Sequence, residues 1–449
     1  MPPLLALSTE HRALDTGHWP LYPLDFAAMG LRPLKVVILA AGKSTRMKSR
    51  TPKVLHKLAG QPVLRWVLEQ AAAMGAAETI VVVGFEGDAV RKKFAKVPNL
   101  KFVTQQPQQG TGHAVMQARE ALAGFDGDVA VLCGDVPLVR AETLAALREA
   151  HDSARTSCTI LTTRVGNPLG YGRIVREGGL VARIAEQKDL KPGEEMISEI
   201  NSGTYIFSAP ELLSRLDRLT TNNAQGEYYL TDVVKLLRDD GHTVAASICA
   251  DEAEVMGIND RAQLAVAEAH ARARINGALM RDGVTIVDPA TTYIEVGVTI
   301  GRDTVIYPCS VIRAGVEIGE ECEIGPFAHL RPGTKLANGC KVGAFVETKA
   351  AVFGEGSKSG HLAYLGDVTL GRHVNIGAGT IVANYDGEKK HQTEIGDNAF
   401  IGCGTVLVAP VKVGKNSQTG ANTVVPKGKD VPDNTIVVGA PARKLKDRS

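Results

Sequence analysis

The chain has 449 residues, 44% of them apolar, so we expect two globular domains rather than a single core. Its 51 Lys and Arg nearly balance its 49 Asp and Glu, and a net charge of +2 gives no electrostatic reason to expect a nucleic-acid partner. The seven cysteines are far apart and form no C-x-x-C pair, which argues against a zinc ribbon or a disulfide framework and favours a reducing cytoplasm.

The N-terminal segment, residues 1–33, has apolar pieces but neither a basic start nor a continuous apolar stretch, so we expect no signal peptide. The best apolar run, 36–41, is far shorter than the roughly 18 residues of a membrane span, so we expect no membrane partner and a cytoplasmic protein. We interpret residues 1–28 as dispensable, with Met29 as the natural first residue; a loosely docked extension is the alternative.

Residues 34–258 alternate short apolar runs with amphipathic stretches, a pattern typical of β-α-β units around a mostly parallel sheet. The segment 259–282, rich in Ala, Arg and Leu without Pro, predicts a connecting helix and the domain boundary. Within the first domain we expect buried strands at 34–39, 79–83, 129–132 and 159–161, and helices at 63–74 and 111–122.

Residues 283–449 follow a six-residue beat that predicts a parallel β-helix, in which each repeat gives one short strand and one aliphatic core residue. Such hexapeptide repeats are associated with left-handed coils. Two segments, 348–367 and 384–393, break the beat, and we expect both to be loops ejected on the functional face. The first nine positions of the beat are Ile294, Ile300, Ile306, Ile312, Ile318, Ile324, Leu330, Leu336 and Val342.

The segment VVILAAGKSTRM (36–47) is a strand followed at once by a small, basic turn. Such a turn lets backbone N–H groups approach phosphate oxygens, while Lys43 and Arg46 neutralise their charge. It matches neither a Walker A loop nor the Rossmann G-x-G-x-x-G pattern, so tight packing alone is an equal alternative at this point.

Longer motifs make the comparison specific. LAAGKSTRM and TPKVLHKLAGQPVL resemble sugar-1-phosphate nucleotidyltransferases, and QQPQQGTGHA, VLCGDVPL, NPLGYGRIV, IAEQKD, INSGTY, NAQGEYYLTD and VMGIND continue the resemblance. From about residue 34 to its end, the chain resembles the bifunctional N-acetylglucosamine-1-phosphate uridylyltransferase / glucosamine-1-phosphate N-acetyltransferase family.

That resemblance implies a uridylyl-transfer site in the first domain, residues 34–258, with Asn259 just beyond it. Lys53 and Arg46 would meet phosphate, and Asp135 with Asn259 would share one Mg²⁺. An Asp that follows a buried strand fits this role, because open α/β sheets bind ligands at that edge. The implied nucleotide-binding residues are Leu39, Ala40, Ala41, Gly42, Lys53, Gln106, Gly110 and Thr111, and the implied sugar-phosphate residues are Gly172, Glu186, Asn201 and Asn259.

The resemblance also implies an acetyltransferase site in the repeats, carried by LRPG, FVETK, GHLAYLGD, VNIGAG and NYDGEKK. Acetyl transfer to an amine needs a base, and a histidine with an ordinary pKa near 6.5 suits neutral pH, so His361 is the candidate, with Glu347 expected to orient it. The implied sugar-phosphate residues are Arg331, Lys349, Tyr364 and Asn375, with Lys390 as a further cation, and the implied acetyl-CoA residues are Asn384, Tyr385, Cys403, Ala421 and Arg443.

Two positions of the implied acetyl-CoA site depart from the family pattern. Gly439 stands where some members carry an arginine for the coenzyme phosphates, and we expect Arg443 to replace it; Cys403 replaces a serine. The resemblance implies Mg²⁺ as the cofactor, with UTP and acetyl-CoA as co-substrates, and we predict a homotrimer. Two alternatives stay open: a single-activity nucleotidyltransferase with a scaffolding β-helix, and a nonenzymatic binding trimer, which would leave Lys53, Asp135 and Asn259 unexplained.

Overall fold

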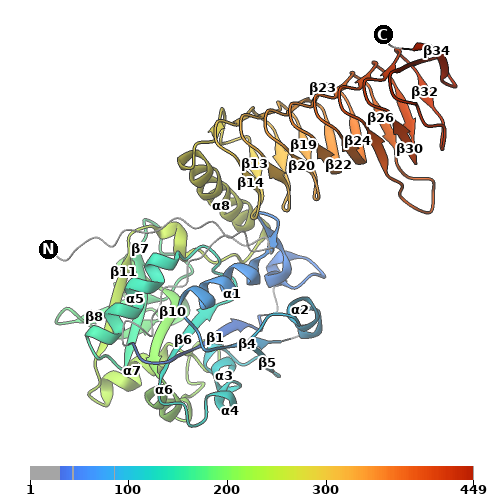
Figure 1. Ribbon diagram of the computed structural model, residues 1–449. Coiled ribbons are helices and arrows are strands. Elements are labelled where there is room, and N and C mark those ends of the chain that lie inside the picture. Colours follow the sequence, from blue (N-terminus) through green and yellow to red (C-terminus); the bar gives the residue numbers. More distant parts are fainter. Residues whose placement is uncertain (1–30, 43–44, 85, 448–449) are drawn as a thin grey trace. The chain divides into compact units, whose positions relative to one another are not determined.

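The computed structural model describes residues 31–42, 45–84 and 86–447 (Figure 1). The expectation for residues 1–28 and Met29 lies outside the described residues. The chain divides into two compact units between Ala271 and Arg272, and each is described by itself. The fold class is the predicted one: an α/β unit with a mostly parallel sheet, followed by a parallel β-helix of hexapeptide repeats.

The first unit is built on a sheet with the strand order β11-β7-β10-β6-β1-β4-β5. All neighbours on this path are parallel except β10, which runs antiparallel to β6 and β7. The hairpin of β8 and β9 joins the sheet through β10. The strands are β1 Leu34–Ala40, β4 Glu78–Val83, β5 Leu100–Thr104, β6 Asp128–Cys133, β7 Cys158–Arg164, β8 Arg173–Glu177, β9 Leu180–Ala185, β10 Glu199–Ser208 and β11 Val244–Cys249, with β2 Lys57–Leu58 and β3 Gln61–Pro62 in a separate pair.

Helices cover both faces of this sheet, which is why the predicted strands are apolar throughout rather than alternating. Val36 and Ile38 of β1 face one core, with α1, α2 and α5, while Val37 faces the other, with α3, α6 and α7. The helices are α1 Val63–Ala73, α2 Gly87–Phe94, α3 Thr111–Met116, α4 Arg119–Leu122, α5 Ala141–Ser153, α6 Ala209–Leu216 and α7 Asp232–Asp239. Short 3₁₀ turns occupy Thr45–Met47, Lys53–Leu55, Gln187–Asp189, Glu194–Met196 and Glu252–Val255.

One predicted helix is divided in two. We expected a single helix over 111–122, but the chain tightens between α3 and α4. The N–H groups of Gln117 and Ala118 donate to the carbonyls of Ala114 and Val115, three residues back, as in a 3₁₀ turn (3.2 and 2.9 Å). The change of hydrogen-bond pattern therefore ends α3 near Met116.

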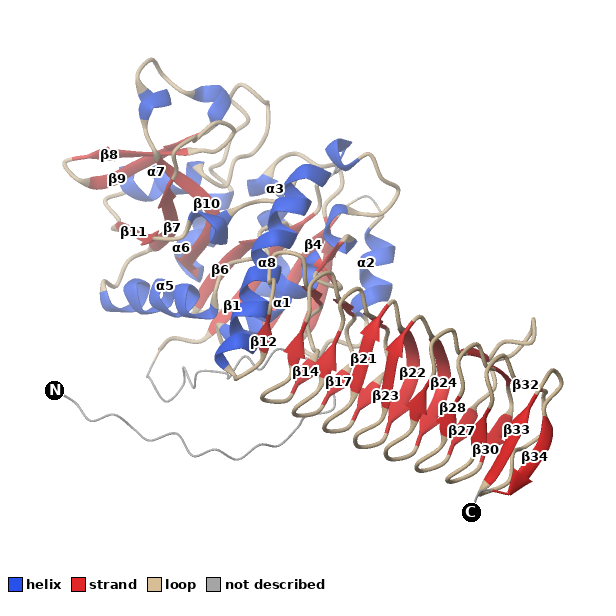
Figure 2. Ribbon diagram, turned by 90° about the horizontal axis from the view of Figure 1, so that it is seen from above, coloured by secondary structure: helices blue, strands red, loops and turns tan. Residues whose placement is uncertain are grey.

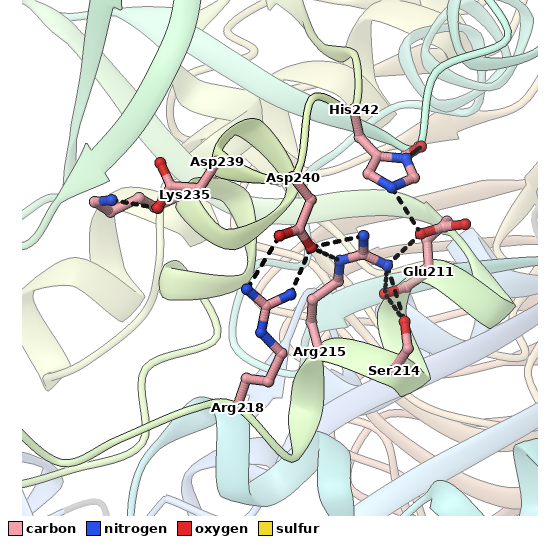
Figure 3. A network of polar contacts seen from close by, with 9 residues as sticks. Glu211, Ser214, Arg215, Arg218, Lys235, Asp239, Asp240 and His242 are labelled. Carbon is pink, nitrogen blue, oxygen red and sulfur yellow. Dashed lines mark hydrogen bonds and ion pairs between the residues drawn. The ribbon is translucent and has the colours of Figure 1, made fainter.

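A network of ion pairs fastens α6 to the end of α7 (Figure 3). Arg215 is its centre: the guanidinium pairs with Glu211 on its own helix and with Asp240 after α7 (2.8 Å to Asp240). Arg218 also donates to Asp240 (3.1 Å), and His242 Nε2 lies 3.3 Å from Glu211 Oε2. Only 8% of the Arg215 side chain is exposed, so its charge depends on these partners.

The long helix α8 (Arg261–Arg281) falls within the segment for which a helix was predicted. Its Asn276 is fully buried and donates to the carbonyls of Pro289 and Thr292 (2.9 and 3.0 Å), which ties the helix to the start of the first coil. Arg272 lies over the ring of Tyr293 (4.3 Å). These contacts cover the open N-terminal end of the repeat core.

The repeats form stacked coils with three flat faces (Figure 2). The first face holds β12 Thr285–Ile286, β15 Val305–Ile306, β18 Glu323–Ile324, β21 Lys341–Ala344, β23 Lys358–His361, β25 Asn375–Ile376, β28 Phe400–Ile401, β31 Gln418–Thr419, β33 Thr435–Val438 and the antiparallel β34 Arg443–Asp447. The second holds β13 Tyr293–Ile294, β16 Val311–Ile312, β19 His329–Leu330, β26 Ile381–Ala383, β29 Val406–Val408 and β32 Val424–Val425; the third holds β14 Thr299–Ile300, β17 Glu317–Ile318, β20 Lys335–Leu336, β27 Thr393–Ile395 and β30 Val411–Val413. Strands β22 Glu347–Phe353 and β24 Tyr364–Leu370 span the second and third faces.

The expectation that 348–367 is an ejected loop is wrong, because this segment stays in the coils as β22, β23 and the start of β24. Coils advance by 18 residues up to β22, but by 17 here: Lys341 pairs with Lys358 and Glu347 with Tyr364. The aliphatic beat disappears for a second reason. Thr348 and Ser359 occupy buried core positions, and the large Phe353 lies between them in sequence, also buried. The core remains filled although the period is lost.

The expectation that 384–393 leaves the coils is confirmed. The register from β26 to β29 advances by 25 residues, since Ile381 pairs with Val406, so one coil carries extra chain. The inserted chain folds back on itself: Tyr385 forms an antiparallel bridge with Lys390, and His391 N donates to Asn384 O (2.8 Å). We call residues 384–391 the inserted hairpin.

Candidate active sites

A cavity of about 490 Å³ lies at the carboxyl ends of β1, β4 and β6 in the first unit. Its wall includes Ala41 and Gly42 after β1, Gly84 after β4, and Asp135 after β6. This is the edge at which open α/β sheets bind ligands, because the loops diverge there and leave space. The predicted nucleotide-binding residues that line it are Leu39, Ala40, Ala41, Gly42, Lys53, Gly110 and Thr111.

Four predicted phosphate and metal residues lie together in one corner of the first unit. The Lys53 ammonium pairs with Asp135 Oδ2 and lies 3.3 Å from Asn259 Oδ1. Arg46 donates to the same Asn259 oxygen (2.8 Å). A backbone bond from Ile258 N to Asp135 O (2.8 Å) fixes the two oxygen-bearing segments side by side, although they are distant in sequence. Two oxygens therefore converge on one cation.

The glutamine predicted to read the base does not line the cavity. Gln106 is exposed and is not part of the cavity wall, whereas Gln105 and Gln108 line it. Gln105 is buried and donates from Nε2 to Gly110 O (2.8 Å), and Gln108 donates to Ala41 O. The Q-Q-P-Q-Q run offered no means of choosing among four glutamines, because strand β5 ends at Thr104 without a pattern that fixes their direction.

Gly110 and Thr111 join two walls of the cavity. Gly110 has φ +102°, and Thr111 Oγ1 accepts from Leu230 N (3.0 Å). Gly112 N donates to Tyr228 O (2.8 Å), so the start of α3 and the 227–230 segment are held against each other.

The predicted sugar-phosphate residues form a second group. Asn201 N donates to Gly172 O (2.9 Å), and the Asn201 side chain donates to Tyr205 Oη (2.7 Å). Glu186 accepts from Thr231 Oγ1 (3.0 Å), and burial raises the pKa of its carboxyl. A carboxyl whose pKa is raised by burial is typical of a functional site as well as of a core.

Cys133, which the sequence did not single out, links these two groups. It lines the cavity at the end of β6, and its thiol donates to Gly203 O (3.4 Å), close to Asn201 on β10. Burial raises the pKa of this thiol to about 12, so it is neutral at physiological pH. A Cβ on Gly203 would lie 2.6 Å from the sulfur, so the glycine permits the close approach.

In the second unit, several of the predicted acetyl-transfer residues lie along one edge of the β-helix, the turn between its first and second faces, which we call the first corner. His361 lies on this corner at the end of β23, is exposed, and pairs in register with Ala344. Cys403 and Ala421 follow on the same corner, one coil apart, because Asn422 N donates to Cys403 O (2.7 Å). Asn375 lies on the first face beside this corner.

A cluster of charged and polar groups lies at the other end of the second face, where the chain turns toward the third face. The ammonium of Lys349 has a lowered pKa, first because of the neighbouring Lys390 ammonium. Asn384 donates to Asp367, and a Cβ on Gly366 would lie within 2.7 Å of both Asn384 Nδ2 and the Tyr364 hydroxyl. Two cations held close together in this way form a natural anion site.

Arg331 and Glu347 form an ion pair on the second face (2.7 Å). We expected Glu347 to orient His361; its carboxylate is instead bonded to the Arg331 guanidinium, which leaves the imidazole of this chain without that partner. The register explains this pairing, because it places Arg331 one coil below β22.

The remaining predicted coenzyme residues lie further along. Tyr385 is exposed in the inserted hairpin and donates to Gly387 O. Gly439 continues the column of Cys403 and Ala421, since Thr419 pairs with Val437. Arg443 begins the antiparallel strand β34, opposite Val438. Gly439 and Arg443 are thus brought to one end of the β-helix.

Comparison with known proteins agrees with this two-part arrangement. A MobA-like NTP transferase domain model matches residues 36–227, and the bacterial transferase hexapeptide model matches 297–330, 315–350 and 392–427. The Bifunctional protein GlmU of Geobacter metallireducens is 46% identical over 92% of this chain and 98% of its own length. The chain belongs to the GlmU family of bifunctional proteins. GlmU proteins of Pelobacter propionicus (48% identical, 90% of this chain, 95% of its own) and Lactococcus lactis (46%, 90% and 94%) are similar across the same extent.

The stretch that the hexapeptide model leaves unmatched, 351–391, contains the shortened coils and the inserted hairpin. Both departures from the repeat thus coincide with predicted site residues, His361, Tyr364 and Asn384. Among the described residues, no group of three or more His, Cys, Asp or Glu could hold a metal ion, and no helix has the length and hydropathy to cross a membrane.

Proposed function

We propose that the two reactions of this enzyme are divided between the two units. As a GlmU family member, the chain is a bifunctional transferase of UDP-N-acetylglucosamine synthesis: it acetylates glucosamine-1-phosphate with acetyl-CoA, then transfers uridylyl from UTP to N-acetylglucosamine-1-phosphate and releases pyrophosphate. We assign uridylyl transfer to the cavity of the first unit and acetyl transfer to the first corner of the β-helix. The observation that carries the first assignment is the convergence of Asp135, Asn259 and Lys53 at the cavity edge.

In uridylyl transfer, the sugar-1-phosphate oxygen attacks the α-phosphorus of UTP and pyrophosphate leaves. No covalent intermediate with the protein is needed, so catalysis comes from position and from neutralising charge on the phosphate oxygens. Lys53 and Arg46 supply two cations at the cavity edge, and the backbone of Ala41 and Gly42 borders the same space. Gln105 and Gln108, rather than Gln106, would contact the base.

The Asp135 and Asn259 oxygens fit one Mg²⁺. Both are hard donors, they are held together by a backbone bond, and both already face a single cation, the Lys53 ammonium. When bound, Mg²⁺ supplies charge neutralisation to the triphosphate, with water and phosphate oxygens completing its shell. Lys53 is then available to phosphate rather than to Asp135.

The sugar phosphate of this first reaction site would be held by Gly172, Glu186 and Asn201. Their support is geometric: Asn201 is bonded to Gly172 through the backbone, and Glu186 lies on the segment after β9 with a buried carboxyl. The Cys133 thiol, bonded beside Asn201 and lining the nucleotide cavity, makes the two subsites continuous.

In acetyl transfer, His361 takes a proton from the sugar amine as the amine nitrogen attacks the thioester carbonyl, and the coenzyme thiolate leaves. Its exposed position on the first corner leaves the imidazole accessible to substrate. The Lys349 and Lys390 ammonium groups, with Arg331 nearby, would neutralise the sugar phosphate. Tyr364 and Asn375 flank the same corner, and Cys403, Ala421, Asn384, Tyr385 and Arg443 would contact acetyl-CoA.

We propose a homotrimer as the working assembly. Along the first corner, Phe327, Phe345 and Leu362 are 49%, 59% and 62% exposed, and the two rings stack at 5.2 Å. All three have positive φ (57°, 57° and 41°), a conformation that costs about 1–2 kcal/mol outside glycine. Large apolar side chains at costly, exposed turns are explained if other copies of the chain cover them.

The experiment that tests this function is a product analysis of the purified protein. Glucosamine-1-phosphate with acetyl-CoA alone should give N-acetylglucosamine-1-phosphate, and addition of UTP and Mg²⁺ should give UDP-N-acetylglucosamine and pyrophosphate. A protein that uridylylates N-acetylglucosamine-1-phosphate but never acetylates would support a scaffolding β-helix instead.

A further inference from the structure

We propose that Asp386 is a positioning residue for acetyl transfer: it fastens the inserted hairpin in the conformation that presents Lys390 beside Lys349. This inference rests on the proposed acetyltransferase function of the second unit. The proposed acetyltransferase function assigns no role to Asp386.

The inserted hairpin has few means of holding its shape. It leaves the coil after Ala383 and returns at Thr393, so it lacks the register of the stacked strands around it. The structure records one isolated bridge across it, between Tyr385 and Lys390, with the backbone bond from His391 N to Asn384 O at its base and one from Asp386 N to Lys389 O (3.2 Å) at its tip. Such a short excursion needs side-chain support to adopt a single conformation.

Asp386 supplies that support at the tip. Its Oδ1 accepts from the N–H groups of Glu388 (3.0 Å) and Lys389 (2.8 Å), which closes the turn. Its Oδ2 accepts from His391 Nε2 (2.6 Å) on the returning strand of the hairpin. One carboxylate thus connects the turn to the strand that follows it.

Asp386 also ties the hairpin to the neighbouring coil, because Lys427 lies 3.6 Å from Oδ2. These donors lower the pKa of the Asp386 carboxyl, with the backbone N–H of Lys389 as the largest cause. At the base of the hairpin, Asn384 is bonded to Asp367 of the coil on the other side. The hairpin is therefore held at both ends, and Asp386 provides the outer attachment.

The contacts of Asp386 matter because the inserted hairpin holds the Lys390 ammonium close to the Lys349 ammonium. The Lys390 ammonium lowers the pKa of Lys349, so the two groups repel each other when no anion is bound. Repulsion favours conformations in which the hairpin moves Lys390 away. A protein that must present both cations to a phosphate has to fix the hairpin by other contacts, and Asp386 makes the densest set of them.

Two variants of Asp386 separate the effect of its hydrogen bonds to the turn from the effect of its negative charge. Asp386→Asn keeps a side-chain oxygen for the two backbone donors but loses the attraction to Lys427, whereas Asp386→Ala loses both. Asp433→Ala is the matched control, because Asp433 also accepts a backbone N–H, from Lys415 (2.8 Å), but lies outside the inserted hairpin. Each full-length protein is assayed for acetyl transfer with varied glucosamine-1-phosphate, and for amide hydrogen exchange at Glu388 and Lys389.

We expect Asp386→Ala to raise KM for glucosamine-1-phosphate about tenfold with kcat within about twofold of the parent, and to accelerate exchange at both amides. Asp386→Asn should restore most of the affinity and the protection, and Asp433→Ala should change neither. Parent KM and parent protection in Asp386→Ala would overturn the inference, as would an equal effect of Asp433→Ala. If the parent itself fails to acetylate, the proposed function fails, and the exchange measurement still tests whether Asp386 holds the hairpin.

Discussion

A methyl group added at Gly110 should damage uridylyl transfer and leave acetyl transfer intact. Gly110 has φ +102°, and a Cβ there would lie 2.5 Å from Tyr228 O and 2.9 Å from Glu227 Cβ. With ψ 175° as well, this backbone lies in a region essentially restricted to glycine and costs at least about 1 kcal/mol in alanine. Displacing Tyr228 O also weakens its bond from Gly112 N, which is worth about 1 kcal/mol.

Together these give about 2 kcal/mol, and if it falls on the transition state, kcat/KM for uridylyl transfer drops about 30-fold. The assay is pyrophosphate release from UTP and N-acetylglucosamine-1-phosphate, with acetyl transfer measured on the same preparation. Gly241→Ala is the control: Gly241 has φ +83° but no atom within 4 Å of an added Cβ. Parent activity in Gly110→Ala, or an equal loss in Gly241→Ala, would refute the reasoning.

Four further outcomes follow from particular contacts. Lys53→Met should lower uridylyl kcat about a hundredfold, as expected for a lost phosphate contact, while the exposed Lys57→Met leaves it unchanged; equal effects would contradict the site. Arg215→Ala should lower the free energy of unfolding by about 2 kcal/mol in urea titration, because the carboxylates of Glu211 and Asp240 lose a buried partner. An unchanged free energy of unfolding would show that the ion-pair network does not stabilise the fold. Burial raises the pKa of Glu186, so its ionised form opposes folding, and the stability contributed by the protonated carboxyl is lost as pH rises through that pKa. Glu186→Gln should therefore melt at a higher temperature than the parent at pH 7, with no difference near pH 4. It should also bind N-acetylglucosamine-1-phosphate more weakly. Phe345→Glu should dissociate the proposed trimer in sedimentation and abolish acetyl transfer. A variant that sediments as the parent does would place the interface elsewhere.

The sequence was sufficient for the architecture because its two periodicities are carried by buried residues. Residues Val36 to Ile38 face two cores, and the aliphatic residues from Ile294 to Val342 recur every six residues, which places one on each face of a coil. Both folds could therefore be predicted without knowledge of any long-range contact. The prediction of a loop at 348–367 failed because polar residues fill core positions there. Thr348 and Ser359 occupy core positions and are as buried as the isoleucines, and the coils here are one residue shorter than their neighbours, so this part of the β-helix resembled a loop.

The candidate sites could likewise be predicted only in part from the sequence. Asp135 could be placed because it follows a buried strand, but its partnership with Lys53 and Asn259 depends on contacts across the unit that no spacing reveals. The direction of each glutamine after β5, the thiol of Cys133 beside Gly203, and the pairing of Glu347 with Arg331 are likewise products of register and packing. Local sequence determines which elements form, whereas these pairings appear only after the elements are assembled.

The central claim, that one chain carries two separate catalytic sites, is tested most directly by mixing two inactive variants. His361→Ala should lose acetyl transfer by roughly 10²–10⁴-fold and keep uridylyl transfer from N-acetylglucosamine-1-phosphate, and Asp135→Asn should do the reverse. Each variant alone should fail to convert glucosamine-1-phosphate to UDP-N-acetylglucosamine, and the equal mixture should succeed, because the acetylated intermediate diffuses between proteins. A mixture that stays inactive, or a His361→Ala protein that has lost uridylyl transfer, would contradict the account.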